Sequence, residues 1–327
     1  TINYRILQHD TLKPIFNRSL MAPYPPGSTF KIVTGLIGLQ EGTVYPGTHY
    51  GCAGGYPIGR GVGCHIHPSP LSFIQAIQMS CNTYFCYVFR SIIDKPIFGS
   101  AENGFLVWKK HVESFGFGNR LSIDLPNEQK GTVPSVSFYD RYYRKGGWNS
   151  LTIISLSIGQ GELGTTPLQI ANLSSIIANR GYYYSPHVVK EVKGQVGIDT
   201  KYTTKHTTTI DSTWYNSVVE GMDMAVNGGA GGTALNAALP NIRICGKTGT
   251  AQNPHGADHS VFIAFAPKDN PKIAIAVYIE NAGFGGTWAS PIASLMIEKY
   301  LTDSISRPDL EKYLQDAIIL DRHARKK

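Results

Sequence analysis

No hydrophobic run in this sequence is long enough to cross a membrane. A membrane-spanning helix needs roughly 20 consecutive apolar residues, and no segment approaches that length. The N-terminus also lacks the charged and then apolar pattern of a secretory signal peptide. The chain begins at Thr1 rather than at a methionine, which is consistent with a fragment of a longer protein.

Charged residues are scarce, at 16% of the chain, and the net charge of +7 comes from scattered basic residues. The only dense basic cluster is the tail at residues 322–327, and no aromatic residue interleaves it. We interpret this tail as a solvated terminus and do not expect a nucleic-acid partner. With 327 residues, 42% of them hydrophobic, the chain has a globular composition and is long enough for a sizeable core.

Cysteine is rare, and its odd count of five prevents full pairing within one chain. Cys52 and Cys64 flank a glycine-rich loop and would form a disulfide in an oxidising compartment. The same segment contains His65 and His67, so a zinc site built from Cys52, Cys64 and one histidine is a second interpretation. The spacing matches no standard zinc module. Unpaired structural cysteines are the third interpretation, and the sequence alone leaves all three open.

Several helices are marked by their ends. Residues 28–40 have apolar positions at helical spacing and are followed by Gly42, which predicts a helix with a glycine C-cap. Asp211 or Ser212 is expected to cap a helix that runs to about Val226. A hydroxyl residue followed by proline predicts the start of three further helices. These pairs are Ser69-Pro70, Thr166-Pro167 and Ser290-Pro291.

Strands are expected mainly in the C-terminal third. Segments 242–251, 261–266 and 273–279 are apolar, rich in β-branched residues and joined by short links, which predicts an antiparallel meander. We expect segments 3–7 and 14–17 to add edge strands. The predicted fold class is therefore α+β, with the helix after Ser290-Pro291 covering one face of the sheet. A mostly helical lobe, roughly residues 45–180, is inserted between the sheet-forming ends.

The first of three chemical motifs is Ser28-Thr29-Phe30-Lys31. The serine and lysine are three residues apart on one helix face, so the Lys31 amine can reach the Ser28 hydroxyl. A neighbouring base makes a serine hydroxyl nucleophilic. A helix N-terminus also stabilises the negative charge that develops there. Taken alone, this pattern is more often an ordinary surface pair.

The other two motifs supply polar groups. In Ser80-Cys81-Asn82, a hydroxyl that relays protons and a carboxamide that binds an amide can project the same way from a turn. In Lys247-Thr248-Gly249-Thr250, on a predicted strand, a cation and hydroxyls can bind a carboxylate. We expect Gly249 to leave room for a substrate backbone beside the strand.

Two other interpretations of these motifs fail. Gly246-Lys247-Thr248 would end a phosphate-binding loop only if position 241 were glycine and a helix followed, but residue 241 is Asn241. A lipase-type nucleophile elbow needs glycines two residues before and two residues after Ser28, but these positions are Pro26 and Phe30. The order S-x-x-K, S-x-N and K-T-G instead matches the signature of penicillin-binding proteins and serine β-lactamases, with separations of about 50 and 165 residues.

The wider sequence resembles the transpeptidase domain of class B penicillin-binding proteins, in particular the elongation-type PBP2 group. The resemblance implies one penicillin-binding transpeptidase domain over residues 1–327, with an antiparallel sheet flanked by helices and the active site in a cleft beside the helical lobe. It also implies a membrane anchor and an N-terminal pedestal domain, which this sequence does not contain. Matching segments cover most of residues 10–300: 13–18, 24–31, 80–85, 159–162, 166–172 and 246–252.

The resemblance implies a peptidoglycan D,D-transpeptidase that acts on the D-Ala-D-Ala end of a stem peptide. Ser28 would form the acyl-enzyme, with Lys31 as its base, and a β-lactam would leave Ser28 acylated. Ser80 would pass a proton to the leaving nitrogen, and Asn82 would hold the substrate amide. No cofactor is implied. Some family members carry a metal near the region of His67, but we assign no metal ligand from the resemblance.

The strand motif would bind the other end of the substrate. By resemblance, Lys247, Thr248 and Thr250 would bind the terminal carboxylate beside Gly249. The backbone N–H groups of Ser28 and Thr250 would form the oxyanion hole.

Three alternatives share part of this signature. A β-lactamase needs a deacylating group, and no E-x-x-L-N segment lies between Asn82 and Lys247. A D-Ala-D-Ala carboxypeptidase has the same motifs and differs only in its acceptor. A non-enzymatic β-lactam sensor domain would also be acylated. The resemblance further implies a location outside the bacterial inner membrane, beside a membrane glycan polymerase, and an oxidising location would favour a Cys52–Cys64 disulfide.

Overall fold

The computed structural model describes residues 2–194 and 197–319, so the tail at 322–327 lies outside the described residues. Two short hairpins, β1 with β2 and β3 with β4, accompany one larger sheet. The strands are β1 (Gly55–Tyr56), β2 (Val62–Gly63), β3 (Tyr182–Tyr184), β4 (Lys205–Thr207), β5 (Cys245–Ala251), β6 (His259–Ala266) and β7 (Ile273–Ile279). The α-helices are α1 (Ile2–His9), α2 (Arg18–Met21), α3 (Lys31–Gln40), α4 (Phe73–Gln78), α5 (Asn82–Ile93), α6 (Ala101–Ser114), α7 (Val136–Tyr143), α8 (Pro167–Ala178), α9 (Thr200–Thr203), α10 (Tyr215–Asn227), α11 (Ala289–Thr302) and α12 (Pro308–Asp316).

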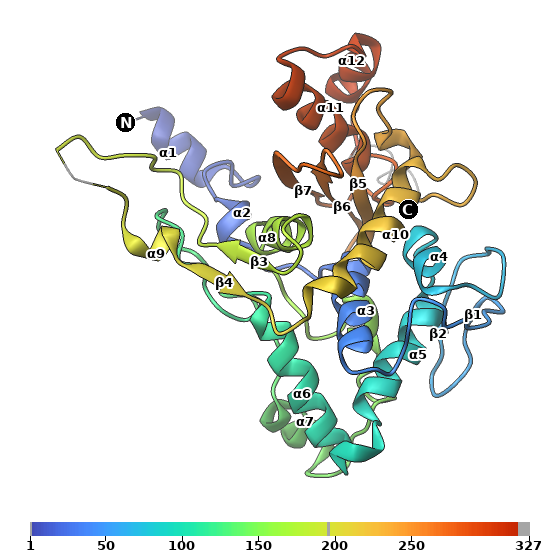
Figure 1. The fold of residues 1–327 in the computed structure, drawn as a ribbon. Coiled ribbons are helices and arrows are strands. Elements are labelled where there is room, and N and C mark those ends of the chain that lie inside the picture. The colour runs from blue at the N-terminus through green and yellow to red at the C-terminus, as the bar shows by residue number, and fades with distance from the viewer. Residues whose placement is uncertain (1, 195–196, 320–327) are drawn as a thin grey trace.

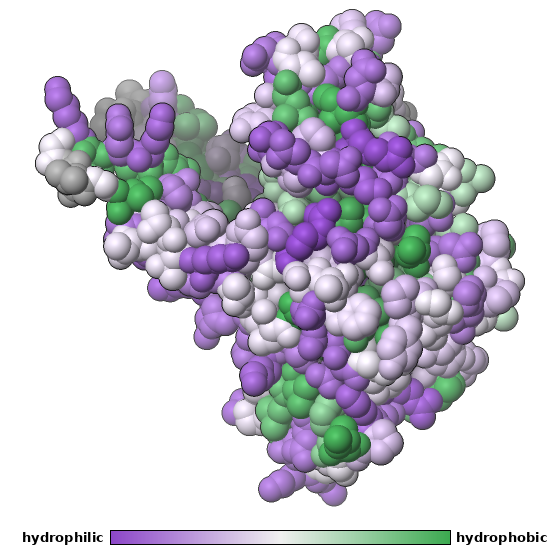
Figure 2. Space-filling view, viewed as in Figure 1, coloured by the Kyte–Doolittle hydropathy of each residue, from purple (hydrophilic) through white to green (hydrophobic). Residues whose placement is uncertain are grey.

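The larger sheet and the helices α5, α6 and α7 occupy different ends of the molecule. Figure 1 shows β5, β6 and β7 in the upper part, beneath α11 and α12, and α5, α6 and α7 in the lower part, with α3 between the two ends. Figure 2 shows mainly hydrophilic or intermediate residues on this face, with separate hydrophobic patches. Scattered exposed apolar residues are usual on a folded protein. Among the helices of the described part, none has the length and apolar character needed to cross a membrane.

The larger sheet is an antiparallel meander in the order β5-β6-β7, as predicted. The central strand β6 is buried on both faces because its side chains alternate between two cores. Ile263 and Phe265 join the large core shared with α8 and α10, whereas Phe262 and Ala264 join a smaller core with α11. The predicted cover of one face by the helix containing Pro291 is thus confirmed, and α8 packs against β6 and β7.

The expected edge strands at 3–7 and 14–17 are wrong. The first segment lies within α1, whose Arg5, Leu7 and Gln8 are good helix formers. The second lies mostly within a turn in which Lys13 has a positive φ of 49° and the Phe16 N–H donates to the Lys13 carbonyl oxygen. Neither segment pairs with the sheet in the described part of the chain, so the sheet comes from the C-terminal third alone.

Thr166-Pro167 starts a helix as predicted, with Thr166 as N-cap and Pro167 at its first position. Ser69-Pro70 does not, because the Ser69 hydroxyl accepts from the Cys52 N–H instead of capping a helix. The N-cap there is Ser72, which forms a capping box with Gln75.

The predicted start at Ser290-Pro291 is also wrong, since α11 already begins at Ala289. Pro291 is tolerated as its third residue because the first backbone N–H groups of a helix have no helical partner. Asp211 caps the 3₁₀ turn η4 (Ser212–Trp214) that leads into α10, and Gly42 has a positive φ of 64° just after α3, so these two end signals are confirmed.

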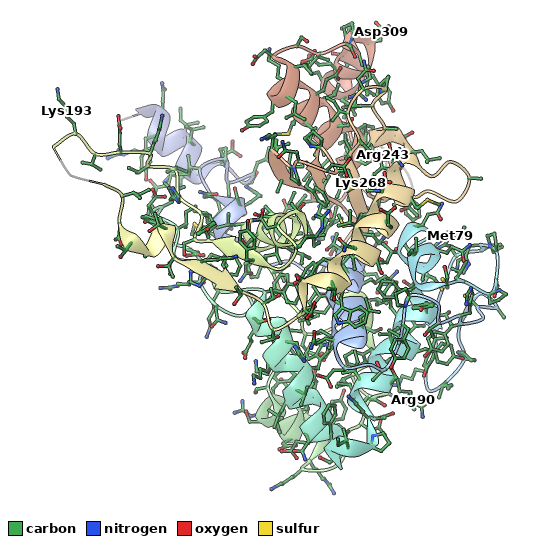
Figure 3. The ribbon with its side chains drawn as sticks, in the orientation of Figure 1. Met79, Arg90, Lys193, Arg243, Lys268 and Asp309 are labelled. Carbon is green, nitrogen blue, oxygen red and sulfur yellow. The ribbon has the colours of Figure 1, made fainter. Side chains whose placement is uncertain are left out.

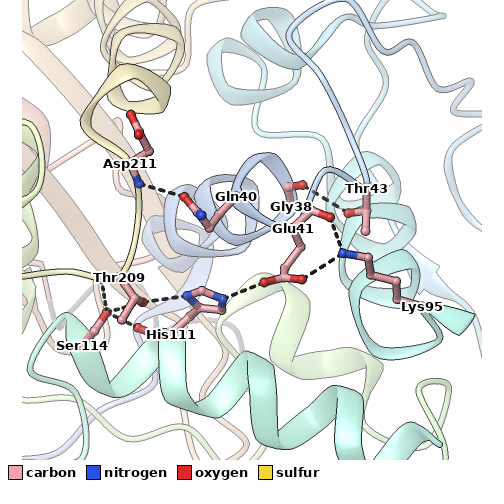
Figure 4. A network of polar contacts seen from close by, with 9 residues as sticks. All are labelled: Gly38, Gln40, Glu41, Thr43, Lys95, His111, Ser114, Thr209 and Asp211. Carbon is pink, nitrogen blue, oxygen red and sulfur yellow. Dashed lines mark hydrogen bonds and ion pairs between the residues drawn. The ribbon is translucent and has the colours of Figure 1, made fainter. Parts of the chain in front are cut away.

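A polar network ties the helices together at the far end of α3 (Figure 4). Glu41 accepts from the Lys95 ammonium at 3.0 Å, and its other oxygen lies 3.0 Å from His111 Nε2. The second ring nitrogen of His111 lies 2.7 Å from the Thr209 hydroxyl. One carboxylate therefore joins α3 to the end of α5, to α6 and to the segment before α10.

Candidate active site

The Ser28 motif begins in the 3₁₀ turn η1 (Gly27–Phe30) and continues into α3. This turn lies against β5. A Cβ atom at Gly27, which has a φ of 56°, would come within 2.6 Å of the Thr250 carbonyl oxygen. A Cβ atom at Gly249 would come within 3.0 Å of the Thr29 methyl group. Both glycines therefore permit close packing of η1 on β5. Our expectation that Gly249 leaves room for a substrate backbone stays a prediction.

Lys31 is fully buried, and its amine reaches across to the turn between α4 and α5 rather than to Ser28. Its Nζ donates to the Ser80 carbonyl oxygen at 2.6 Å and to the Ser80 hydroxyl at 3.1 Å. In the described residues it forms no hydrogen bond with the Ser28 hydroxyl, which corrects the predicted direct contact. Burial lowers the pKa of Lys31 to about 8, although nearby cysteine thiols oppose this shift.

The second motif forms the turn between α4 and α5, directly after Met79, which is labelled in Figure 3. Ser80 has a positive φ of 55°, a conformation that non-glycine residues seldom adopt. Cys81 is the N-cap of α5, and its sulfur accepts the Tyr84 N–H at 3.3 Å. The Asn82 side chain donates to the Gly63 carbonyl oxygen at 2.6 Å, so the end of β2 holds this turn.

The third motif lies on β5, as predicted. Lys247 is fully buried and donates to the Thr248 carbonyl oxygen at 3.1 Å. Burial, helped by the charge of Lys31, places the pKa of Lys247 well below its ordinary value. The Thr248 hydroxyl donates to Thr233 at 3.0 Å. In the described part of the chain neither lysine has a carboxylate partner.

A cleft of about 700 Å³ brings the three motifs together. Both buried lysines lie behind its wall. The residues of the motifs that line it are Ser28, Ser80, Asn82, Thr248, Gly249 and Thr250.

The wall of the cleft also carries polar side chains that the sequence analysis did not assign to the site: Gln160, Thr233, Asn236, Gln252, Asp258 and Thr287. Gln160 donates to the Thr250 carbonyl oxygen at 3.2 Å, which fixes the strand edge next to Ser28. Its segment, 159–162, was already part of the resemblance and could have indicated this position. Thr233 follows the glycine-rich loop after α10, a place that gives no chemical signal in the sequence.

A thiol cluster adjoins the Ser80 turn. The sulfur atoms of Cys52, Cys64 and Cys81 and a ring nitrogen of His67 all lie within 4.8 Å of one another. All five cysteines of the chain are free thiols in this structure, so Cys52 and Cys64 do not form the disulfide that we considered. The sequence did not suggest Cys81 as a ligand, because Cys81 lies 17 residues after Cys64 along the chain.

A sequence model of the family described as penicillin binding protein transpeptidase domain matches residues 3–298. The chain belongs to this family. The peptidoglycan D,D-transpeptidase MrdA of Haemophilus influenzae is 30% identical over 95% of this chain, and that of Acinetobacter baumannii is 29% identical over 94%. The alignments cover 49% and 46% of those two proteins, so the chain spans about half the length of the curated relatives that it matches.

A crystal structure of Pseudomonas aeruginosa PBP2 in complex with WCK 5153 has the same fold. Its TM-score is 0.79 and its identity 30%, over 93% of this chain and 64% of that one. The resemblance to the PBP2 group and the α+β transpeptidase fold that it implied are therefore confirmed.

Proposed function

We propose that this domain is a peptidoglycan D,D-transpeptidase that crosslinks stem peptides through an acyl-enzyme on Ser28. One observation carries the proposal: Ser28, in η1 directly before α3, lines the cleft, and behind its wall lie two fully buried lysines that have no carboxylate partner among the described residues. Buried lysines without a counter-charge favour the neutral amine, which can accept a proton, and favour an anion placed beside them. Both properties suit acyl transfer from a peptide that ends in a carboxylate.

In the acylation step, the Ser28 oxygen attacks the carbonyl carbon of the penultimate D-Ala while Lys31 takes the hydroxyl proton. Catalytic hydrogen bonds often form or tighten only when the substrate binds. The backbone N–H groups of Ser28 and Thr250 then stabilise the oxyanion. The peptide C–N bond breaks, and the terminal D-Ala leaves with a proton that Ser80 supplies. The 3.1 Å contact between the Lys31 amine and the Ser80 hydroxyl supports this relay.

The remaining groups position the peptide. Asn82 accepts or donates at the substrate amide, and the Thr248 and Thr250 hydroxyls bind the terminal carboxylate, with Lys247 as the positive charge behind them. Strand β5 pairs only with β6 among the described strands, so its other edge faces η1 and the cleft. An extended peptide can lie along such an edge.

In the second step, an amine of a neighbouring stem peptide attacks the acyl carbon, an amide bond forms and the Ser28 hydroxyl is regenerated. We propose that the whole protein acts outside the inner membrane beside a glycan polymerase, as the resemblance implies. A carboxypeptidase would use water in this second step, and this is the main alternative.

The acyl-enzyme is tested by intact mass after incubation with a β-lactam. The wild-type protein should gain the mass of one drug molecule, and Ser28→Ala should gain none. Ser137→Ala, an exposed serine on α7, serves as the matched control and should be labelled like the wild type. Equal labelling of Ser28→Ala and wild type would contradict the proposed function.

The acceptor is tested with a D-Ala-D-Ala peptide. Transpeptidation predicts that an added amine diverts the released acyl group into a new amide, detected by mass. Hydrolysis alone, whatever the amine concentration, would support the carboxypeptidase. Rapid turnover of a chromogenic cephalosporin would support a β-lactamase instead.

A further inference from the structure

Two adjacent residues, Gly159 and Gln160, bond to the two elements that meet beside Ser28. The Gly159 carbonyl oxygen accepts from the Gly27 N–H at 2.9 Å, and Gly27 directly precedes Ser28 in η1. The Gln160 side chain donates to the Thr250 carbonyl oxygen on β5 at 3.2 Å. The short loop at 159–161 therefore joins η1 to the end of β5.

The backbone of this loop has a fixed shape. It follows the 3₁₀ turn η3 (Ile154–Ile158), and the Gln160 N–H donates back to the Ser155 carbonyl oxygen at 3.1 Å. Gly159 and Gly161, on either side of Gln160, have positive φ values of 72° and 73°, which glycine adopts at no steric cost. A Cβ atom at Gly159 would come within 2.2 Å of a carbonyl oxygen of η1, so the loop lies directly against that turn.

The turn η3 is itself anchored in the core. The Thr34 hydroxyl of α3 donates to the Ser157 carbonyl oxygen at 3.0 Å, and both residues are fully buried. Leu156, between them and the loop, belongs to the large hydrophobic core. A group carried by a rigid, buried element is held more precisely than one on a free loop. The loop at 159–161 can therefore fix the position of what it bonds to.

The Gln160 side chain is 9% exposed, and its small exposed part lines the cleft. A backbone carbonyl oxygen can only accept a hydrogen bond, so the N–H₂ end of the amide must face Thr250. The orientation of the amide is thus set by its partner on β5. Met in place of Gln160 would have a similar size and would lack this donor.

The bond to Thr250 also indicates where the N–H groups of the site point. The N–H and C=O groups of one strand residue point to the same edge of the strand. Since the Thr250 carbonyl points to Gln160, the Thr250 N–H also points away from β6. Ser28 is the second residue of η1, and the first N–H groups of a helical turn have no helical partner. The two N–H groups of the proposed oxyanion hole thus lie on the two elements that the loop joins.

We propose that Gln160 is a positioning residue for acyl transfer. Together with the Gly159 carbonyl oxygen, it sets the separation between the Ser28 N–H and the Thr250 N–H. When the Ser28 oxygen bonds to the substrate carbonyl carbon, the π electrons of that carbonyl move onto its oxygen. Both N–H groups must then lie about 2.7–3.1 Å from that single atom. The inference rests on the proposed function of the cleft.

Loss of the Gln160 bond should therefore affect the chemical step more than binding. Contacts to the oxyanion are made fully only in the transition state, so weakening them lowers the rate constant and leaves substrate affinity nearly unchanged. Removing one donor from an oxyanion hole lowers the rate by about 10²–10³. A donor that is displaced but still present should cost less, about tenfold to a hundredfold.

The first experiment measures acylation of the whole chain by benzylpenicillin in a stopped-flow instrument. The dependence on drug concentration separates the acylation rate constant from the dissociation constant of the complex that precedes it. In Gln160→Met we expect the rate constant to fall by about tenfold to a hundredfold and the dissociation constant to stay within about twofold.

Asn172→Leu is the matched control, because Asn172 is also a buried amide that donates to one backbone carbonyl, that of Phe115, away from the cleft. Its two constants should stay within about twofold of wild type. Thermal melting should show that each variant is folded at the assay temperature. If Gln160→Met is unfolded there, Gln160→Leu takes its place.

The second experiment examines the oxyanion hole in the acyl-enzyme. Benzylpenicillin labelled with ¹³C at the β-lactam carbonyl places the label on the ester formed with Ser28, and infrared difference spectra give its stretching frequency. Hydrogen bonds to the ester oxygen lower this frequency. We expect a higher frequency in Gln160→Met and the wild-type value in Asn172→Leu.

The outcomes separate this inference from the proposed function. An unchanged rate constant or an unchanged stretching frequency in Gln160→Met would overturn the positioning role, while the acyl-enzyme on Ser28 would stand. Slower acylation of the same size in Asn172→Leu would show a general packing effect and would also overturn it. A wild-type protein that benzylpenicillin does not acylate would refute the function proposed for the cleft.

Discussion

The two buried lysines of the cleft and the mostly buried Lys268 have opposite surroundings. In the cleft, Lys31 and Lys247 have no carboxylate partner in the described residues, and burial lowers the pKa of each. At the outer side of α10, Lys268 lies 2.9 Å from the buried carboxylate of Asp223 and 2.7 Å from Glu220. There the ion pairs outweigh the effect of burial and raise the pKa of Lys268. Figure 3 shows Lys268 and Arg243 close together beside α10.

The difference indicates which lysines serve the fold and which serve chemistry. A buried ammonium that is satisfied by carboxylates joins elements, as Lys268 joins the end of β6 to α10. A buried amine without such a partner costs stability, because its charged form is desolvated. We infer that such an amine is retained for an anion or a proton that arrives with the substrate. Four predictions test this comparison.

The largest effect is expected for Lys31→Met. Removing the proposed base should lower the second-order rate constant of β-lactam acylation by about 10²–10⁴, the usual contribution of general acid–base catalysis. Lys268→Met is the matched control, since it also removes a mostly buried lysine, but one with carboxylate partners. Its acylation rate should stay within about twofold of wild type. Stopped-flow measurement of both variants shows whether Lys31 acts as a base or only packs in the core.

The pH dependence of acylation should follow the neutral form of Lys31. Because burial places its pKa at about 8, the rate constant should rise about tenfold per pH unit between pH 6 and 7 and level off above pH 8. The sign follows from the role: an ammonium cannot accept the Ser28 proton. A rate that is flat from pH 6 to 9 would exclude Lys31 as the titrating base.

Asp223→Asn should affect stability and leave acylation unchanged. Burial alone would raise the pKa of Asp223, but hydrogen bonds from Arg243, Lys268 and Asn227 lower it, so the ionised form stabilises the fold. The amide keeps the shape but removes charge-assisted hydrogen bonds. We expect the free energy of unfolding in urea to fall by about 2 kcal/mol. An acylation rate that fell in parallel would show that this pair also supports the cleft.

The smallest effect is expected for Glu41→Gln in the network of Figure 4. Burial would raise the pKa of Glu41, but His111 and Lys95 lower it below its ordinary value. The folded state therefore gains stability from the carboxylate at neutral pH and loses it as the pH falls through the depressed pKa. Wild type should be more stable than the variant by under about 1 kcal/mol at pH 7, and this difference should vanish near pH 3. Urea unfolding at both pH values measures it.

Local signals in the sequence predicted the elements whose ends are determined locally. Thr166-Pro167 starts α8 as expected because hydroxyl, proline and Gln169 all act within one turn. Ser69-Pro70 carries the same signal, but Ser69 bonds to the distant Cys52 instead. No local pattern contains that contact. The N-terminal segments failed for a related reason, since an edge strand requires a partner that the sequence does not identify.

The candidate site was likewise predicted where its residues are neighbours in the sequence and missed where they are distant. The three motifs were found because each is contiguous, and the cleft brings them together. The path of Lys31 to Ser80 was missed, because a spacing of three residues favoured Ser28 and could not show the turn that comes closer. Cys81 was missed as a possible ligand because it lies 17 residues from Cys64 along the chain.

The positive φ of Ser80 means that one substitution at this position should raise stability and lower activity. Glycine adopts a positive φ at no steric cost, so Ser80→Gly removes a conformational penalty of order 1 kcal/mol while deleting the hydroxyl that contacts Lys31. A search for stabilising variants would therefore favour the substitution that removes the proposed proton relay. We therefore expect directed evolution for heat tolerance to replace Ser80 and directed evolution for turnover to keep it.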